Sequence, residues 1–392
     1  MNEMLSGIKV LDFGQYIAGP LAAMMLAEQG AEVIKIERPQ GDPFRKKDGF
    51  MVWNRSKKNI VLDLTRPEGQ EIALDLIKDA DVIIENFRPG VMEKLGLSYE
   101  RIQAINPRII YCSISGFGDS GPYTRIPGYE QLVSSLSTIY AEQGYATRPT
   151  YVLLPLASSA AGLDAAYSIV AALCVREGTG QGQKIEATLF NSALSINRDK
   201  ALNFPGVYRY HWLPTGTFPF YRIYKCADGK HLFLGLGNFK FVTMFVLLIE
   251  REDWLVGDLL DGAPFGMLPP KAGMMVARLK DIFLTKTRDE WLELLLPNGI
   301  PVAPIQTIDD YMEYGQVKAN GLVVTVKQPG KGMAKEVGIP IKPSLTPGSI
   351  KGPSALPGQH TAEILTRLGY SSGDIKKLKR DGIVRISRRI KK

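Results

Sequence analysis

The sequence contains few of the residues that most often carry redox, metal or nucleophile chemistry. Among its 392 residues there are only three cysteines and three histidines. The cysteines, Cys112, Cys174 and Cys226, stand far apart in the sequence. A disulfide framework is therefore not predicted, and the chain is expected in the cytoplasm, where thiols stay reduced.

Long apolar runs are also missing. No stretch approaches the length of about eighteen apolar residues that a transmembrane helix needs, so none is predicted. The N-terminus, MNEMLSGIKV, lacks the basic and then apolar order of a signal peptide. The glycine-rich stretch Gly116–Pro122 matches neither the dinucleotide-binding pattern nor the Walker A pattern, so by itself it does not predict a phosphate-binding loop.

The charge is unbalanced toward the basic side. The net charge is +8, and five of the last eight residues are basic. A basic tail is compatible with nucleic acid, but no nucleic-acid-binding motif occurs elsewhere in the chain. We favour a solvated tail on a protein that handles anionic ligands, and we expect neither nucleic acid nor a membrane as a partner.

The strongest pattern that is present lies near the N-terminus and predicts a strand, a helix and a second strand. Ile8–Phe13 is a short apolar run with branched residues, which favours a strand. Leu21–Gln29 is rich in Ala, Leu and Met and favours a helix, with Pro20 expected at its first position. Ala31–Ile36 is the second strand, and such a βαβ unit has parallel strands and a right-handed connection.

Two arginines, Arg38 and Arg45, follow the second of these strands. Ligands of open α/β sheets bind outside the carboxyl ends of the strands. Cations at this position therefore indicate an anionic ligand.

The same alternation continues to about residue 190 and predicts a parallel α/β sheet. Strands are expected at 60–64, 82–84, 109–114 and 184–189, helices from Pro67 and at 91–95, 99–105 and 162–175, and a polar loop between Arg45 and Lys58.

The pattern changes near residue 205. Asp228-Gly229 lies between two runs of strand-forming residues and predicts a β-hairpin over 218–236. The region 205–320 is therefore expected to be a smaller α+β domain. Later elements are helices at 241–250, 288–295 and 361–368, a strand at 322–327, and an extended proline-rich segment at 340–357.

Eight blocks of sequence, spread over almost the whole chain, carry a family signature. They are LSGIKVLDFGQYIAGP, GAEVIKIERPQGD, NRSKKNIVLDLTRPEG, DVIIENFRPGVMEKLGL, NPRIIYCSISGFGDSGPY, PGYE, AAGLDAAYSIVAALCVREGTGQGQKIEATLF and PGQHTAEIL. In this order and spacing they resemble the family III CoA-transferases, the group of formyl-CoA transferase and carnitine CoA-transferase.

The resemblance implies an α/β fold with a Rossmann-like large domain made from both chain ends, 1–204 and 321–392. A smaller α+β domain, 205–320, would be inserted between them. The resemblance also implies a dimer, or a higher assembly, in which two ring-shaped subunits interlock. Coenzyme A or acyl-CoA and a carboxylic acid would be the substrates, with no permanently bound cofactor and no metal.

The resemblance further implies which residues contact CoA. The matching positions are Ala18, Arg38, Leu62, Asp63, Leu64, Thr65, Asn86, Phe87, Arg88, Lys94, Tyr129 and Glu130. This chain departs from the family at Ile17, where a polar residue is usual, at Thr65, where lysine is frequent, and at Lys94, where arginine is common. CoA is strongly anionic, so cations and backbone N–H groups at strand ends suit it on physical grounds alone.

Ser158 departs most from the family pattern, because it stands where the family has its catalytic aspartate. In the family that carboxylate attacks the acyl-CoA and then becomes an enzyme-bound CoA thioester. A serine hydroxyl has no acyl carbon, and no histidine stands near it in the sequence to activate it. We expect Ser158 to be inactive and Ser158 or Ser159 to cap the helix that follows. Glu130, which borders the family's site, remains a candidate catalytic carboxylate.

Three functions stay open at this point. In the first, the chain is the non-catalytic subunit of a CoA-transferase whose homologous sister subunit carries the aspartate. Benzylsuccinate CoA-transferase is a family member built from two different subunits. In the second, the chain is an acyl-CoA isomerase or lyase with altered chemistry. In the third, it binds CoA without catalysis. We favour the first.

The sequence does not specify the acyl group. An aromatic cluster is compatible with an aromatic acyl group, but packing and hairpin pairing are the favoured interpretation. Its members are Tyr208, Tyr210, Trp212, Phe218, Phe220 and Tyr221.

Overall fold

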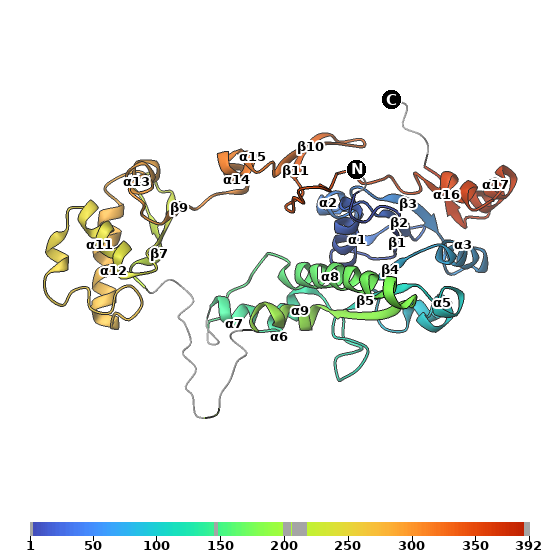
Figure 1. The fold of residues 1–392 in the computed structure, drawn as a ribbon, viewed down its shortest axis with the longest axis horizontal. Coiled ribbons are helices and arrows are strands. Elements are labelled where there is room, and N and C mark those ends of the chain that lie inside the picture. Colours follow the sequence, from blue (N-terminus) through green and yellow to red (C-terminus); the bar gives the residue numbers. More distant parts are fainter. Residues whose placement is uncertain (1–2, 145–147, 199–204, 206–217, 388–392) are drawn as a thin grey trace. The chain divides into compact units, whose positions relative to one another are not determined.

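The computed structural model describes residues 3–144, 148–198, 205 and 218–387. The chain forms two compact units (Figure 1). The larger unit comprises Met1–Ile139, Val152–Leu202 and Lys318–Lys392, and the smaller one comprises Tyr140–Tyr151 and Asn203–Val317. The larger unit therefore contains both chain ends. Residues 388–392 of the basic tail lie outside the described residues.

A seven-stranded sheet of order β12-β3-β2-β1-β4-β5-β6 forms the framework of the larger unit. Its strands are β1 (Lys9–Asp12), β2 (Glu32–Glu37), β3 (Lys58–Leu62), β4 (Val82–Glu85), β5 (Ile110–Ser115), β6 (Gln183–Thr188) and β12 (Val384–Arg385). Neighbours among β1 to β6 are parallel, whereas β12 is antiparallel to β3. The predicted α/β, Rossmann-like fold with a parallel sheet is confirmed.

β1 lies between β2 and β4, and Val10 pairs with Val33 on one side and with Val82 on the other. The strand order reverses at this point. The connections that leave β1 and β4 consequently run to opposite faces of the sheet and leave a crevice between them. The register therefore places a ligand crevice beyond Asp12 and Glu85.

Helices cover both faces of this sheet (Figure 1). α3 (Pro67–Lys78), α5 (Tyr99–Ile105), α16 (Thr361–Arg367) and α17 (Ser372–Arg380) share one hydrophobic core with the strands. α1 (Ala18–Glu28), α8 (Leu156–Thr179), α9 (Leu189–Ile196) and α6 (Glu130–Leu136) pack together on the other face. Strand residues alternate between the two sides, so Ile83 lies in the first core, while the equally buried Val82 and Ile84 point to the opposite face.

α1 and α8 pack closely because both present small residues at their contact. At Gly162 a Cβ would lie 3.0 Å from the carbonyl oxygen of Ala18 and 2.9 Å from Cδ2 of Leu21. A larger residue at Gly162 would therefore push the two helices apart. This contact fixes the start of α1 beside the first turns of α8.

α8 is, within the described part of the chain, the one helix that is long and apolar enough to cross a membrane by length and composition. About 44% of its apolar window is buried inside the fold. It packs against α1, α9, β5 and β6. We therefore interpret α8 as a core helix.

The larger unit is completed by chain from its C-terminal third. β10 (Val323–Gln328) and β11 (Gly332–Val337) form an antiparallel hairpin. Arg55 anchors this hairpin to α1, because its Nε donates to Glu28 at 2.5 Å and its Nη1 donates to the carbonyl of Val337 at 2.6 Å. Residues 338–360 contain no helix or strand, as the proline-rich composition predicts.

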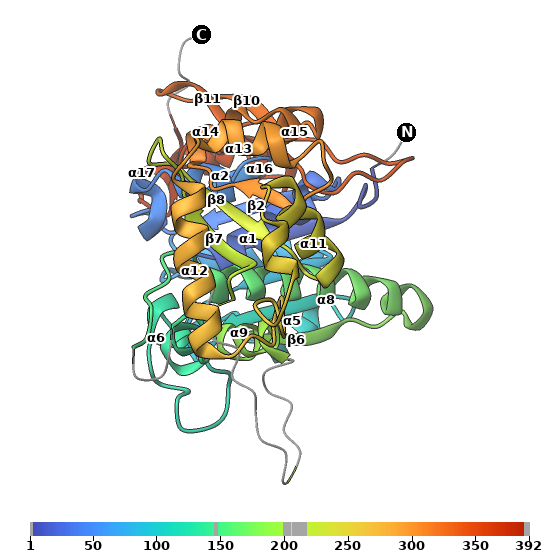
Figure 2. The same ribbon diagram turned by 90° about the vertical axis from the view of Figure 1, so that its left-hand side faces the viewer.

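The smaller unit is built on the antiparallel strands β7 (Tyr221–Lys225), β8 (His231–Gly235) and β9 (Val302–Pro304). The predicted hairpin is confirmed, and Gly229 takes the left-handed conformation that its turn requires, with φ of 78°. α11 (Phe239–Leu248), α12 (Pro269–Phe283) and α13 (Arg288–Leu295) enclose an aromatic core with these strands (Figure 2).

The aromatic residues of the smaller unit pack against one another. The ring of Phe283 lies 4.7 Å from Tyr224 and 5.1 Å from Trp291 between centroids. Phe218 and Tyr221 both contact Phe265. Packing thus accounts for the described members of the predicted aromatic cluster, and Phe220 is fully buried. Tyr208, Tyr210 and Trp212 lie outside the described residues.

The structure corrects several predicted boundaries, among them that of α11, which lies two residues earlier than expected. α1 begins at Ala18, so Pro20 is its third residue, where the missing N–H has no helical partner in any case. α8 begins at Leu156, six residues before the predicted start. β3 lies two residues earlier than expected. The predicted polar loop after Arg45 contains a 3-10 turn, η1 (Pro43–Lys46), and a short helix, α2 (Gly49–Trp53).

Other elements were not predicted at all. They are α6, α7 (Ile139–Gln143), α9, η2 (Glu252–Leu255), α12, β9, α14 (Ile308–Glu313), α15 (Gly315–Ala319), β11, α17 and β12.

Candidate functional site

One amide side chain closes the crevice between β1 and β4. Asn86 follows β4, and its Oδ1 accepts from the backbone N–H of Gln15 at 2.7 Å. Its Nδ2 donates to the carbonyl of the same residue at 2.8 Å. Because both bonds go to one backbone position, Asn86 ties the loop after β1 to the end of β4. One N–H group and one lone pair of the amide are used in this contact.

The residues expected to contact CoA lie around this crevice. Ala18 is the buried first residue of α1, and Arg38 follows β2. Leu62 ends β3 and is followed by a turn in which Asp63 accepts from the hydroxyl of Thr65 at 2.6 Å. Phe87 and Arg88 continue the segment after β4, and Lys94 ends α4 (Val91–Lys94). The fold thus brings the loops after four neighbouring strands to one edge of the sheet.

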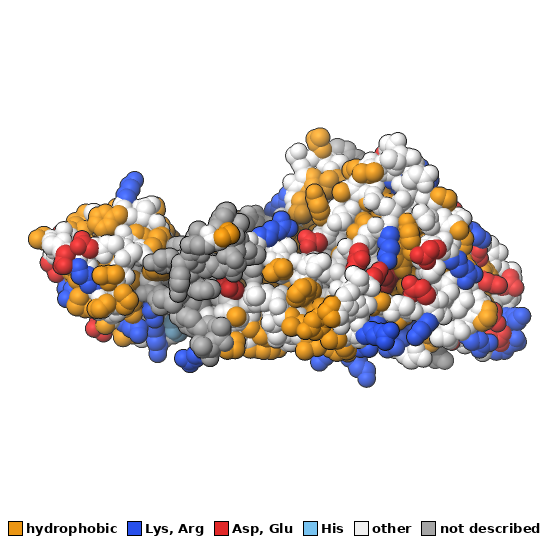
Figure 3. Space-filling view, turned by 90° about the horizontal axis from the view of Figure 1, so that it is seen from below, with side chains coloured by type: hydrophobic (Ala, Val, Ile, Leu, Met, Phe, Trp, Pro, Cys, Tyr) orange, Lys and Arg blue, Asp and Glu red, His pale blue; other side chains and the backbone are white. Residues whose placement is uncertain are grey.

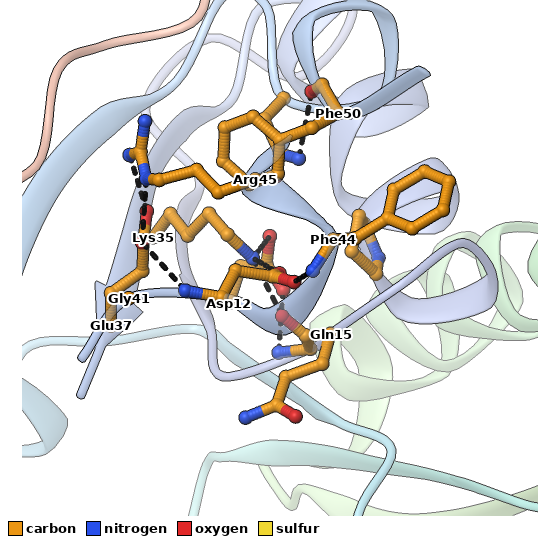
Figure 4. Close-up of polar contacts among 12 residues, drawn as sticks. Asp12, Gln15, Lys35, Glu37, Gly41, Phe44, Arg45 and Phe50 are labelled. Atoms are coloured by element: carbon orange, nitrogen blue, oxygen red, sulfur yellow. Dashed lines mark hydrogen bonds and ion pairs between the residues drawn. The ribbon is translucent and has the colours of Figure 1, made fainter. Parts of the chain in front are cut away.

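The cations at this edge divide into two kinds. Arg45 is engaged, because its Nη2 lies 2.6 Å from Oε1 of Glu37, its Nε lies 2.9 Å from Oε2, and its guanidinium covers the ring of Phe50 at 4.4 Å (Figure 4). The charge of Arg45 is therefore balanced by Glu37, and the expectation that it faces an anionic ligand stays a prediction. Arg38 is exposed, and its Nε donates to the carbonyl of Gly41 at 3.0 Å.

Among the described residues, Arg38, Arg88 and Lys94 have no acidic partner within ion-pair distance, and all three are exposed. Three cations at the carboxyl edge of a parallel sheet suit a ligand with several phosphates.

Glu130 and Ser158 form a second part of the site. Ser158 is the third residue of α8, whose N-cap, Pro155, offers no side-chain acceptor. Glu130, the first residue of α6, supplies that acceptor from 28 residues away. Its Oε1 accepts from Ala157 N at 2.8 Å, and its Oε2 accepts from the backbone N of Ser158 at 2.8 Å and from its hydroxyl at 2.6 Å.

This arrangement corrects the predicted role of the serines. Neither Ser158 nor Ser159 caps α8. The hydroxyl of Ser158 donates a hydrogen bond, and the amide of Ser159 donates to the carbonyl of Pro155 at 2.9 Å. A carboxylate suits this place because the first turn of a helix has free N–H groups and a positive dipole end. Glu130 is therefore the cap of α8, and both of its oxygens are occupied.

Two close glycine contacts place this pair beside the crevice. At Gly116, which follows β5, a Cβ would lie 2.4 Å from the Cα of Gly128. This backbone contact holds the segment that carries Tyr129 and Glu130 on the end of the sheet. Tyr129 itself is 56% exposed. The contact of Gly162 with Ala18 holds the start of α8 beside the start of α1.

Among the described residues, no histidine is hydrogen-bonded to Ser158, whose hydroxyl donates to Glu130. His231 lies on β8 in the smaller unit. His360 accepts from the backbone N–H of Asn59 at 3.1 Å through Nδ1, and burial lowers its pKa. His211 lies outside the described residues.

Sequence reasoning missed Glu85, the last residue of β4. It is 5% exposed, and its Oε2 accepts from Phe87 N at 2.8 Å. Burial raises the pKa of Glu85 to about 7, although hydrogen bonds from Ser113 and from Phe87 N oppose the shift. A charged residue at the end of a buried strand is the signal that could have identified it.

The described residues contain no group of three or more His, Cys, Asp or Glu able to hold a metal ion.

Known proteins resemble the chain along most of its length. The family model CoA-transferase family III matches residues 5–361. Succinyl-CoA:glutarate CoA-transferase of Mus musculus is 32% identical, over 97% of this chain and 90% of its own. Formyl-CoA:oxalate CoA-transferase of Streptomyces avermitilis is 31% identical, over 98% of this chain and 100% of its own length. The crystal structure of a CAIB/BAIF family protein from Brucella suis superposes with a TM-score of 0.81 at 29% identity. The match covers 94% of this chain and 100% of that chain. The chain belongs to CoA-transferase family III.

Proposed function

We propose that this chain is the CoA-binding, non-catalytic subunit of a CoA-transferase that moves CoA between carboxylic acids. A homologous sister subunit would carry the catalytic aspartate. Relatives named for transfer between two acids support the reaction class. The CoA contacts named above, the division into 1–204, 205–320 and 321–392, and the interlocked arrangement of subunits belong to this proposal.

The observation that carries the proposal is the pairing of Ser158 with Glu130. Transfer through an enzyme-bound CoA thioester needs a side chain with an acyl carbon, and a serine hydroxyl has none. Glu130 has one, but its two oxygens accept three hydrogen bonds from the first turn of α8. To attack a thioester, Glu130 would have to give up the cap of a 24-residue helix that packs on α1.

An exposed apolar surface supports a partner subunit. Apolar side chains gather on the face of the larger unit that α6, α8 and α9 cover (Figure 3). Leu153 is 80% exposed and Tyr167 is 76% exposed. Other exposed apolar residues of these segments are Leu132, Leu136, Leu154, Leu163, Val175, Leu194 and Ile196. Apolar patches of this kind are typical of protein contacts.

The test is to assay the chain alone and together with a paralogue that has aspartate at the position of Ser158. Both are expressed separately and together, and CoA transfer is followed with succinyl-CoA and glutarate and with formyl-CoA and oxalate. We expect the two chains to co-purify and only the mixture to transfer CoA. Transfer by this chain alone, unchanged by the partner, would contradict the proposal.

One observation favours a second candidate, an acyl-CoA enzyme with altered chemistry such as an isomerase or lyase. The hydroxyl of Ser158 lies 2.6 Å from a carboxylate oxygen that could accept its proton. Ser158→Ala separates this candidate from the first, because it would abolish an activity that uses the hydroxyl. A third candidate, CoA binding without catalysis, predicts acyl-CoA binding and no transfer in any mixture.

A further inference from the structure

The loop between β1 and α1, which leads to the proposed CoA contact at Ala18, is tightly folded. The backbone N–H of Gly14 donates to Oδ1 of Asp12 at 2.8 Å. A Cβ at Gly14 would lie 3.0 Å from the Cα of Gly19, so the two ends of the loop nearly touch. Tyr16 has a φ of 61°, which residues other than glycine rarely adopt. Such a conformation persists only where the surrounding structure imposes it.

Two buried lysines hold the ends of this loop. Nζ of Lys57 donates to the carbonyl of Pro20 at 2.8 Å, to Oδ2 of Asp12 at 2.7 Å and to Oδ1 of Asn54 at 3.1 Å, so all three of its N–H groups are used. Nζ of Lys35 donates to the carbonyl of Gly14 at 2.6 Å (Figure 4).

The charges in this cluster balance. The Lys35 ammonium lies 3.8 Å from Oδ2 of Asp12 and 3.3 Å from Oδ2 of Asp42. The side chains of Lys35 and Lys57 are 2% and 1% exposed, so neither contacts a ligand in the crevice. A buried ion pair is rarely more stable than apolar residues of similar size. An apolar residue at position 57, however, could not hold the carbonyl of Pro20.

We propose that Lys57 is a positioning residue for CoA, whose ammonium fixes the loop between β1 and the first turn of α1 in the shape that presents Gln15 to the ligand. The inference rests on the proposed CoA-binding function of this crevice. A loop that is ordered before binding spares the ligand the entropy of ordering it. Asn86 fixes the same loop from the side of β4.

The proposal predicts a dependence on pH. The charged groups that face Lys57 are Asp12 on β1, Lys35 on β2 and Asp42 after β2, and Glu28 on α1 is near enough to feel its charge. Burial lowers the pKa of Lys57 to about 8, and Asp12 opposes this shift. Above that pH the neutral amine has two N–H groups for three acceptors. The loop then loses a bond, and acyl-CoA affinity falls.

The experiment measures acetyl-CoA binding to the full chain by calorimetry at about pH 7 and about pH 9. Acetyl-CoA has no free thiol, so the ligand itself does not titrate in this range. We expect Lys57→Met to bind about tenfold more weakly at the lower pH. The native chain should lose about tenfold between the two pH values, and Lys57→Met should show no such step.

Lys58→Met is the matched control, because Lys58 is the next residue but pairs with Glu32 and Glu363 at the surface. It should bind like the native chain. The positioning role would be overturned if Lys57→Met bound acetyl-CoA with an affinity within about threefold of that of the native chain and the native chain showed no loss of affinity between the two pH values. If Lys57→Met does not fold, the native pH profile decides alone.

Arg38→Ala tests the underlying function separately. If the native chain does not bind acetyl-CoA, or if Arg38→Ala binds as well as the native chain, the proposed CoA site is wrong and the role of Lys57 fails with it. If Arg38→Ala weakens binding and Lys57 has no effect, only the positioning role is wrong.

Discussion

The two units of this protein are stabilised in different ways. Within the described part of the chain, every buried polar or charged residue belongs to the larger unit. The core of the smaller unit contains stacked aromatic rings and aliphatic side chains, with Phe283 between Tyr224 and Trp291. The larger unit buries whole ion pairs such as Lys57 with Asp12 at 2.7 Å.

This difference concerns how the larger unit holds the loop between β1 and α1. Buried ion pairs contribute little net stability, because desolvation offsets most of their attraction. Here they bind the carbonyl of Gly14 in the loop after β1 and the carbonyl of Pro20 in the first turn of α1. The smaller unit also contains backbone of uncommon conformation, since Glu250 has a φ of 56°, but its described part contains no buried ion pair. The four predictions below test this contrast, from the largest expected effect to the smallest.

The largest effect is expected at Arg55, which is 2% exposed and pairs with Glu28 and Glu336. Burial already raises the pKa of Glu28 despite its bond to Arg55. Arg55→Met should lower the free energy of unfolding of the larger unit by about 3–5 kcal/mol, because it leaves buried carboxylates without a partner. Urea denaturation with native-state hydrogen exchange measures this loss.

A matched control combines Arg55→Met with Glu28→Gln and Glu336→Gln. It should recover much of the stability, since no charge is then left unpaired. If Arg55→Met alone lowered the free energy of unfolding by less than about 1 kcal/mol, the buried ion pairs of Arg55 would not hold the hairpin of β10 and β11.

The second effect concerns pH. Burial raises the pKa of Glu85 to about 7, above the ordinary value of 4.5. The folded chain therefore keeps a proton that the unfolded chain loses, and stability falls as the pH rises from about 4.5 through about 7, by up to about 3 kcal/mol. Glu85→Gln should remove this slope, as measured by chemical unfolding at several pH values.

Glu290 of the smaller unit is the control for Glu85. Hydrogen bonds from the hydroxyl and backbone N–H of Thr287 lower its pKa, so it should not contribute to a decline between pH 5 and 7. Glu290→Gln should leave the slope in place. An unchanged slope in Glu85→Gln would show that another group causes it.

The third effect compares two helix caps. Glu130 caps α8 across 28 residues, whereas Thr287 caps α13 locally in a capping box with Glu290. Glu130→Ala should destabilise the first turn of α8 by about 1–2 kcal/mol, and Thr287→Ala should cost about 1 kcal/mol at α13. Hydrogen exchange at Ala157 and Ser158 should speed up only in the first variant. Unchanged exchange there would mean that Glu130 does not cap α8.

The smallest effect is expected for Ser158→Ala. The variant loses one hydrogen bond to Glu130, worth about 1 kcal/mol, while the two backbone bonds of the cap remain. CoA transfer by the assembled complex should stay within about threefold of the native rate. A loss of about a hundredfold, about 2.7 kcal/mol in the barrier, with folding and assembly intact, would assign the hydroxyl a chemical role.

Local signals predicted much of the fold. Tyr99–Ile105 and Arg288–Leu295 were predicted at their observed bounds, and the structure shows that their N-caps, Ser98 and Thr287, bond within their own helices. The buried apolar runs of β1, β2, β4 and β5 were also predicted. The start of α8 was missed because its cap comes from Glu130, which no pattern around Leu156 can indicate.

The sequence by itself determined the family and the parallel sheet, since both depend on residue identity and on the order of blocks along the chain, and the identity of residue 158 is the basis of the proposal that the chain lacks the catalytic carboxylate. Only the tertiary structure decided where the hydroxyl of Ser158 points and which carboxylate it meets, because Gly116 and Gly128 bring Glu130 there by a contact of backbones. Only the tertiary structure likewise decided that Lys35 and Lys57 are buried and hydrogen-bonded around the loop between β1 and α1. Lysines are usually solvated, and these two can leave water because Asp12 and Asp42 supply their counter-charges inside the fold.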